Sequence, residues 1–126
     1  MSLRHWVDGP HRRPDQIDPG TRRAVGHMYR PSFERAATMI PPQPLDPPAI
    51  HRLRDLVVSI MLVVGDLDAD VIHEISNLLV EQIACVRRLD LPGVAHMASM
   101  ERPQTLNAAV PEFLAQQQRD ALPGRR

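Results

Sequence analysis

The chain has 126 residues, which is enough for one domain with a modest core. Its 15 basic residues balance its 15 acidic residues, so we expect no electrostatic capture of nucleic acid or of an anionic membrane. The single cysteine, Cys85, excludes a disulfide framework and a C-x-x-C metal site. The start lacks the apolar core of a signal peptide, and the longest apolar stretch is about half the length that crosses a bilayer. We therefore expect a soluble, cytoplasmic protein without a bound metal or cofactor.

Residues 1–50 are predicted to form a short helical segment followed by a proline-rich linker. Asp18 followed by Pro19 is typical of a helix N-cap with proline at the first helical position. Pro31 is expected to divide residues 18–37 into two short helices. Apolar residues are sparse here, so this segment should pack on another part of the protein. The run PPQPLDPP at 41–48 predicts a linker or surface loop, because proline lacks an amide donor and fixes its φ angle.

Residues 51–126 begin with a strand and a helix. Residues 56–64, LVVSIMLVV, are continuously apolar and rich in β-branched side chains, as in a strand covered on both faces. Residues 70–83 predict a helix because four apolar residues recur at helical spacing. These residues are Ile72, Ile75, Leu79 and Ile83.

A second strand and helix follow. Residues 86–91, VRRLDL, predict a short strand that ends in a turn at Pro92 and Gly93. Residues 102–117 predict a helix, which Pro111 should kink or weaken by about 3 kcal/mol. The apolar face of this helix is formed by Leu106, Val110, Phe113 and Leu114.

The order strand, helix, strand, helix implies an α/β unit with two parallel strands and a right-handed crossover. Two strands are too few for a stable open sheet, so this unit is expected to be the edge of a larger one. Functional residues of such sheets collect beyond the carboxyl ends of the strands. Asp68 follows the first strand and His96 follows the second, so we expect them side by side. A carboxylate hydrogen-bonded to an imidazole is the acid–base half of a nucleophilic triad.

The chain resembles the C-terminal part of an α/β-hydrolase, in the branch that contains enol-lactone hydrolases and related esterases. The resemblance lies in a G-x-x-D turn that ends at Asp68, a G-x-x-H loop that ends at His96, and the E-x-P sequence 101–103. The N-terminal HWVDGPHRRPDQIDP resembles the end of that branch's cap region, so the resemblance covers roughly residues 5–115. It implies that 1–50 is a cap-like segment with its linker and that 51–126 is the βαβα part of the hydrolase domain. It also implies that Asp68 and His96 are the catalytic acid and histidine in hydrolysis of a small-molecule ester or lactone.

The sequence departs from this family at several positions, and two of these departures bear on the fold and the site. The usual I-P-G-A turn before the second strand is replaced by residues 83–86, Ile-Ala-Cys-Val, which lack the glycine that supplies positive φ angles. The G-x-S-x-G nucleophile elbow is absent, because no serine has that glycine frame. The five serines are Ser2, Ser32, Ser59, Ser76 and Ser99. A nucleophile, an oxyanion hole and the central strands would lie upstream of residue 1, so we expect a truncated fragment without activity of its own.

Two alternatives from other classes remain open. The unpaired, apolar edge of the first strand favours a non-catalytic module that self-associates or pairs with another chain. The D-x-D pattern at 66–70 is similar to that of Mg²⁺-dependent aspartyl phosphatases, although those enzymes use a lysine and this chain has none. A calcium loop is disfavoured, because Val71 and Asn77 stand where glycine and glutamate are needed. HEISN at 73–77 likewise lacks the second histidine of a zinc motif.

The other polar residues are given ordinary roles. Asp66 and Asp70 are expected to be hydrated, and Asp70 can also cap the following helix. Cys85 should be an inert thiol. The remaining histidines and arginine pairs are expected to be solvated at the surface. They are His5, His11, His27 and His73, with Arg12–Arg13 and Arg87–Arg88.

Overall fold

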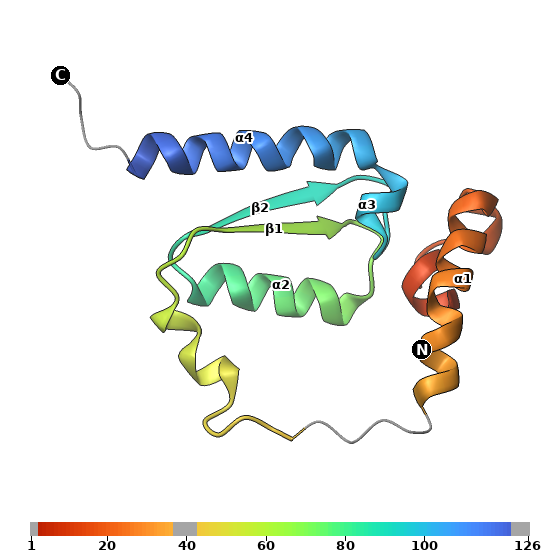
Figure 1. Ribbon diagram of the computed structural model, residues 1–126, viewed down its shortest axis with the longest axis horizontal. Helices are drawn as coiled ribbons and strands as arrows, with labels where there is room; N and C mark the ends of the chain where they lie inside the picture. The colour runs from red at the N-terminus through yellow and green to blue at the C-terminus, as the bar shows by residue number, and fades with distance from the viewer. Residues whose placement is uncertain (1–2, 37–42, 122–126) are drawn as a thin grey trace.

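A computed structural model describes residues 3–36 and 43–121, with residues 32–36 described by their backbone alone. At its centre, β1 (Ile60–Gly65) pairs in parallel with β2 (Val86–Leu91) over the full length of both strands. The helix α2 (Asp70–Gln82) connects the strands and lies on one side of the sheet, and α4 (Pro103–Ala121) lies on the other (Figure 1). The predicted order strand, helix, strand, helix and the parallel pairing are confirmed, and the arrangement is an α/β one.

The first strand begins later than predicted. The amide of Ile60 donates to the carbonyl oxygen of Cys85 at 2.8 Å, directly before β2 begins, so β2 offers no partner to residues 56–59. Those residues follow a short helical turn, η3 (Ala49–Asp55), and Val57 and Val58 are 86% and 59% exposed. The expectation that the whole apolar run is a strand covered on both faces is therefore wrong, because a strand can pair only as far as its partner extends.

The predicted helix over residues 70–83 is confirmed as α2, although its buried face is displaced from the predicted one. Ser76 is buried and its Oγ donates to the carbonyl oxygen of Ile72 at 2.6 Å, while Ile75 is 48% exposed. The face turned inward contains Ile72, Ser76, Leu79 and Ile83. A small serine that satisfies its own hydroxyl within the helix can occupy this position, where sequence spacing favours isoleucine.

Two helices run through a proline. The helix α1 (Pro19–Ala36) is continuous and contains Pro31, so the prediction of two short helices is wrong. The helix α4 likewise continues through Pro111 and is preceded by one turn, α3 (Ala98–Glu101). Proline removes one backbone hydrogen bond, but the turns on either side retain theirs, so a long helix can continue across it. The predicted N-cap is confirmed, since Oδ2 of Asp18 accepts from the amide of Thr21 at 2.6 Å.

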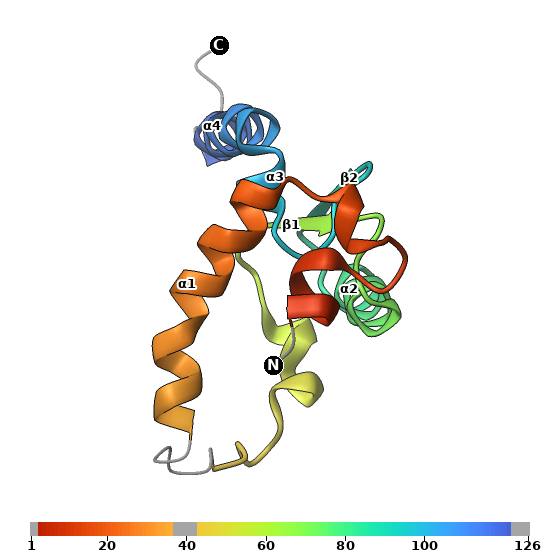
Figure 2. The ribbon, with the colours of Figure 1, turned by 90° about the vertical axis from the view of Figure 1, so that its right-hand side faces the viewer.

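The N-terminal segment packs against the start of α3, as expected of a segment that is poor in apolar residues. It consists of the turns η1 (Arg4–Asp8) and η2 (Pro14–Gln16) followed by α1, whose first turns lie beside α3 (Figure 2). A small buried cluster joins these parts. The cluster consists of Val7, Ile17 and Val25, with Leu3, Tyr29, Met97 and Met100 packed against it.

The remaining connections contain few regular elements. Residues 43–48 of the predicted proline-rich linker are irregular, and its first two residues lie outside the described part of the chain. No non-glycine residue in the described ranges has a positive φ angle. The turn at Ala84 and Cys85 therefore forms without the left-handed backbone conformation for which the family's glycine is suited. The Cys85 side chain is exposed. Among residues 3–36 and 43–121, no helix is both long enough and apolar enough to cross a membrane.

Candidate acid–base site

The loop that leaves β1 holds the Asp68 carboxylate in a buried position. The amide of Asp68 donates to the carbonyl oxygen of Gly65 at 3.2 Å, which folds the loop back on the strand. One carboxylate oxygen, Oδ1, accepts from the amide of Ala69 at 2.8 Å, and the side chain is only 4% exposed. The G-x-x-D turn therefore fixes the orientation of this carboxylate through its own backbone.

The loop that leaves β2 is bound directly to the first loop. Oδ1 of Asp66 accepts from the amides of Gly93 and Val94 at 2.7 and 3.3 Å. In return, the amide of Leu67 donates to the carbonyl oxygen of Val94 at 2.9 Å. The expectation that Asp66 is only hydrated is wrong, because the turn at Gly93, where φ is +70°, presents two amides to its carboxylate.

Asp68 and His96 lie within hydrogen-bonding distance of each other. Nδ1 of His96 is 2.8 Å from Oδ2 of Asp68, and the His96 side chain is 37% exposed. The structure thus brings together the two residues that the sequence singled out, while their catalytic role stays a prediction. Because Nδ1 faces the carboxylate, Nε2 is the ring nitrogen left to exchange a proton with a reactant.

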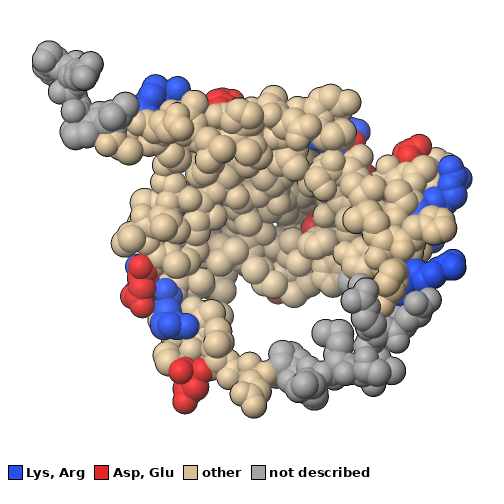
Figure 3. All heavy atoms as spheres, in the orientation of Figure 1, with Lys and Arg blue, Asp and Glu red and all other residues tan. Residues whose placement is uncertain are grey.

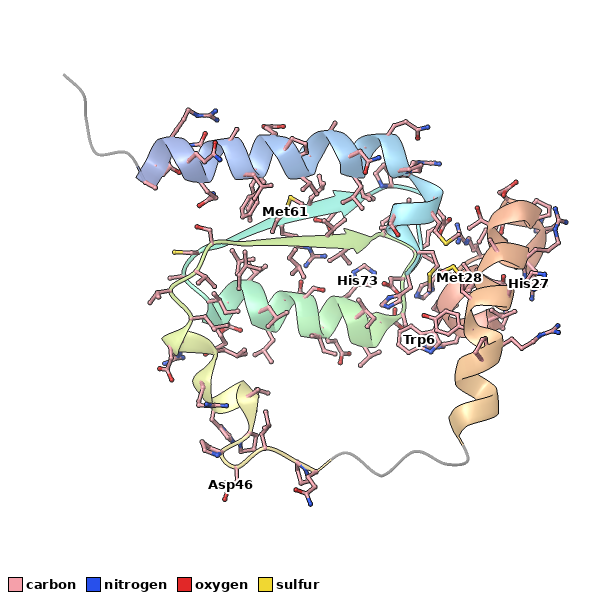
Figure 4. The ribbon with its side chains drawn as sticks, in the orientation of Figure 1. Trp6, His27, Met28, Asp46, Met61 and His73 are labelled. Atoms are coloured by element: carbon pink, nitrogen blue, oxygen red, sulfur yellow. The ribbon has the colours of Figure 1, made fainter. Side chains whose placement is uncertain are left out.

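Trp6 covers part of the His96 ring. The two ring centroids are 4.7 Å apart with the planes at 60°, an edge-to-face arrangement, and His5 packs on Trp6 in turn. Figure 4 shows Trp6 between α1 and the first turn of α2, on the side of the sheet where both strands end. Sequence reasoning did not identify Trp6, and the only signal is that it is the single tryptophan of the chain.

Arg12 is buried beside the site, which contradicts its predicted position at the surface. Its Nη1 lies 2.6 Å from Oε2 of Glu101, and the two side chains are 4% and 8% exposed. Further bonds run from the guanidinium to the carbonyl oxygens of Val7, Asp8 and Gly93. Backbone carbonyls and one carboxylate thus replace water around the charge, which a planar guanidinium with five donors can accommodate.

One further ion pair lies within the N-terminal segment, and another contact joins this segment to α2. The Asp8 carboxylate is fully buried and accepts from Nε of Arg22 at 2.8 Å, and this bond raises the pKa of Arg22 above its ordinary value. His11, predicted to be solvated, is exposed but lies 2.8 Å from Oδ1 of Asp70. Asp70 is the first residue of α2 and not its cap, which is Ala69.

The side chains of the first D-x-D pair and of His27 and His73 bear on the metal-dependent alternatives, which are the aspartyl phosphatase, calcium and zinc sites. Both carboxylates of the first D-x-D pair, Asp66 and Asp68, face partners within the protein. His27 lies on the outer side of α1, and His73 lies on α2 (Figure 4). Among the residues whose placement is described, no three histidine, cysteine or acidic side chains gather closely enough to hold a metal ion.

Comparison with known proteins adds no assignment, since no protein-family model, curated protein or solved structure matches this chain. A buried carboxylate that faces one nitrogen of a partly exposed imidazole holds one tautomer and stabilises the protonated ring. This arrangement is suited to the transfer of a proton at Nε2.

Proposed function

We propose that this chain carries the acid–histidine pair of an ester or lactone hydrolase of the α/β-hydrolase type. The observation that supports this most directly is the 2.8 Å contact between His96 Nδ1 and Asp68 Oδ2 beyond the ends of two parallel strands. In the proposed reaction Asp68 orients the ring and stabilises its positive charge. His96 takes a proton from a serine nucleophile and then donates it to the leaving group.

The proposed nucleophile lies outside residues 1–126. None of the five serines stands in a G-x-S-x-G frame, so the serine and the oxyanion hole must be supplied by another segment or another chain. In the described structure β1 pairs with β2 along one edge only, and a further strand could add at the other edge. We infer that residues 1–126 alone do not turn over an ester through His96, because a triad without its nucleophile retains little catalysis.

A hydrolysis assay with a chromogenic short-chain ester tests this proposal. Residues 1–126 should show no turnover that His96→Ala removes, and clear His96-dependent turnover would contradict our assignment of the nucleophile to another segment. If the genomic sequence within about 200 residues upstream encodes an in-frame G-x-S-x-G, a chain that includes it should be active. In that chain His96→Ala should lower kcat by about 10²- to 10⁴-fold.

His27→Ala is the matched control, because His27 is exposed on the outer side of α1. It should leave the activity of the longer chain unchanged. A longer chain whose ester hydrolysis is insensitive to His96→Ala would refute the proposed role of the pair. An upstream region without any G-x-S-x-G would refute a nucleophile supplied by the same chain.

A second candidate function is a self-associating module, and the exposed residues before β1 favour it. Val57 and Val58 are exposed directly before β1, whose outer edge is unpaired in the described structure. Figure 3 shows that the central face of the molecule, over the sheet and its helices, carries few charged side chains. An open apolar edge of this kind favours pairing with a second copy of the chain.

Light scattering over a range of concentrations tests the second candidate. Association should be present in the wild type and weakened in the double variant Val57→Lys, Val58→Lys, because charge on an edge opposes strand pairing. Arg54→Lys is the control, because it changes a nearby side chain without changing the net charge. It should leave the association as in the wild type. A wild-type chain that stays monomeric at all concentrations would rule out self-association.

A further inference from the structure

Carboxylates from two different elements bind three successive backbone amides directly before His96. Asp66, in the loop after β1, accepts from the amides of Gly93 and Val94. Glu101, at the end of α3, accepts from the amide of Ala95 through Oε1 at 3.3 Å. The backbone that leads into His96 is thus held on one side by the first strand's loop and on the other by α3.

Glu101 is itself held by the N-terminal segment. Its second oxygen, Oε2, pairs with Arg12 Nη1 at 2.6 Å, and both side chains are almost completely buried. Arg12 also donates to the carbonyl oxygen of Gly93 at 3.2 Å, in the same loop. One carboxylate therefore joins the N-terminal segment, α3 and the loop that ends at His96.

We propose that Glu101 is a positioning residue for His96, and that Arg12 sets the position of Glu101. Ala95 directly precedes His96 in the chain. The orientation of the His96 imidazole relative to Asp68 therefore depends on where the Ala95 amide is held. A hydrogen bond to a charged acceptor is about twice as strong as one between neutral groups. Neutralising Glu101 should therefore loosen the His96 backbone and the orientation of its ring, while both strands stay in place.

This inference deepens the proposed function, because it rests on His96 being the group that must be oriented. Its test uses nuclear magnetic resonance of the isotopically labelled chain and does not require turnover. The variant is Glu101→Gln, which retains an oxygen acceptor for the Ala95 amide but removes the charge. The control is Glu112→Gln on α4. The Glu112 carboxylate is exposed and makes a longer contact, 3.6 Å, with the exposed Arg87 guanidinium.

Glu101→Gln should raise the hydrogen-exchange rate of the Ala95 amide by about tenfold. It should also broaden or remove the resonance of the His96 Nδ1 proton that is bound to Asp68. The amides of β1 should keep their protection, and Glu112→Gln should change none of these signals. The His96 ring resonance is the decisive readout, because a residue that only stabilises the fold would leave it unchanged in the folded protein.

Unchanged Ala95 exchange and His96 resonances in folded Glu101→Gln would overturn the proposal. If this variant loses protection throughout β1, the double variant Arg12→Met, Glu101→Gln decides, because it leaves no unpaired buried charge. Wild-type His96 resonances in that double variant would overturn the positioning role, and altered resonances would support it. If only the hydrolysis assay contradicts expectation, so that ester hydrolysis by the longer chain is insensitive to His96→Ala, the proposed function is refuted and the positioning role of Glu101 stands.

Discussion

Replacing Gly65 by alanine should force apart the two loops that hold Asp68 and His96. Gly65 is the last residue of β1 and is buried against the loop after β2. A Cβ atom at this position would overlap the carbonyl oxygens of Val94 and Ala95. These are backbone atoms and cannot rotate away as the end of a flexible side chain can, so one loop has to move.

The expected cost follows from two contributions. Overpacking of a closely packed site costs about 1–3 kcal/mol. Movement of Val94 also strains the bond that its carbonyl oxygen accepts from Leu67 at 2.9 Å, for about 1 kcal/mol more. We therefore expect Gly65→Ala to lower the free energy of unfolding by about 2–4 kcal/mol. Urea unfolding followed by far-ultraviolet circular dichroism should show a midpoint about 1–2 M lower, with the slope m unchanged at about 2 kcal/mol/M.

Gly26→Ala is the matched control, because it places the same methyl group where there is space. A Cβ at Gly26, inside α1, would meet only Cδ1 of Leu3 at 3.5 Å, an ordinary contact. Alanine is favoured over glycine inside a helix by about 0.5–1 kcal/mol, so this variant should be slightly more stable than the wild type. If Gly65→Ala has the same midpoint as the wild type, the close approach of the two loops is refuted.

Two further predictions concern charged groups. Arg12→Met leaves the buried Glu101 carboxylate without its partner, so the free energy of unfolding in urea should fall by about 3–5 kcal/mol. The double variant Arg12→Met, Glu101→Gln should recover most of this loss, because it leaves no unpaired buried charge. A single variant as stable as the wild type would show that the pair is solvated. The hydrogen bond from the Thr21 amide lowers the pKa of Asp18 below its ordinary value. Asp18 therefore stabilises the folded state above the pKa of the unfolded chain, and this contribution is lost as the pH falls through the lower, folded pKa. The thermal midpoints of the wild type and Asp18→Ala should differ near neutral pH and converge as the pH falls below the folded pKa of Asp18, whereas a constant difference would contradict a charged cap.

The parts of the fold that the sequence predicts are those set by local pattern and strand order. The helix α2 and the strand β2 are marked by their own periodicity, which needs no information from distant residues. The contact between Asp68 and His96 follows from topology, because loops that leave neighbouring parallel strands lie at the same edge of the sheet. Only the order of the elements and the position of each residue after its strand are needed for that prediction.

Features that depend on distant partners escape sequence reasoning. Arg12 and Glu101 are separated by 89 positions, and the burial of Arg12 depends on carbonyl groups that only the folded chain brings around it. The same holds for Asp66, whose acceptor role is created by the turn at Gly93. The start of β1 is also non-local, because the six residues of β2 set how many residues of the apolar run can pair.

The contacts around His96 restrict access to its ring. Asp68 occupies Nδ1, Trp6 packs on the ring, and carboxylates bind the backbone before it. Among these contacts the His96 side chain keeps 37% of its surface exposed. The exposed part of the ring is open to solvent, whereas Nδ1 faces the Asp68 carboxylate. The exposure of the ring and the burial of its carboxylate partner are therefore the two features that a proton-transfer role requires together.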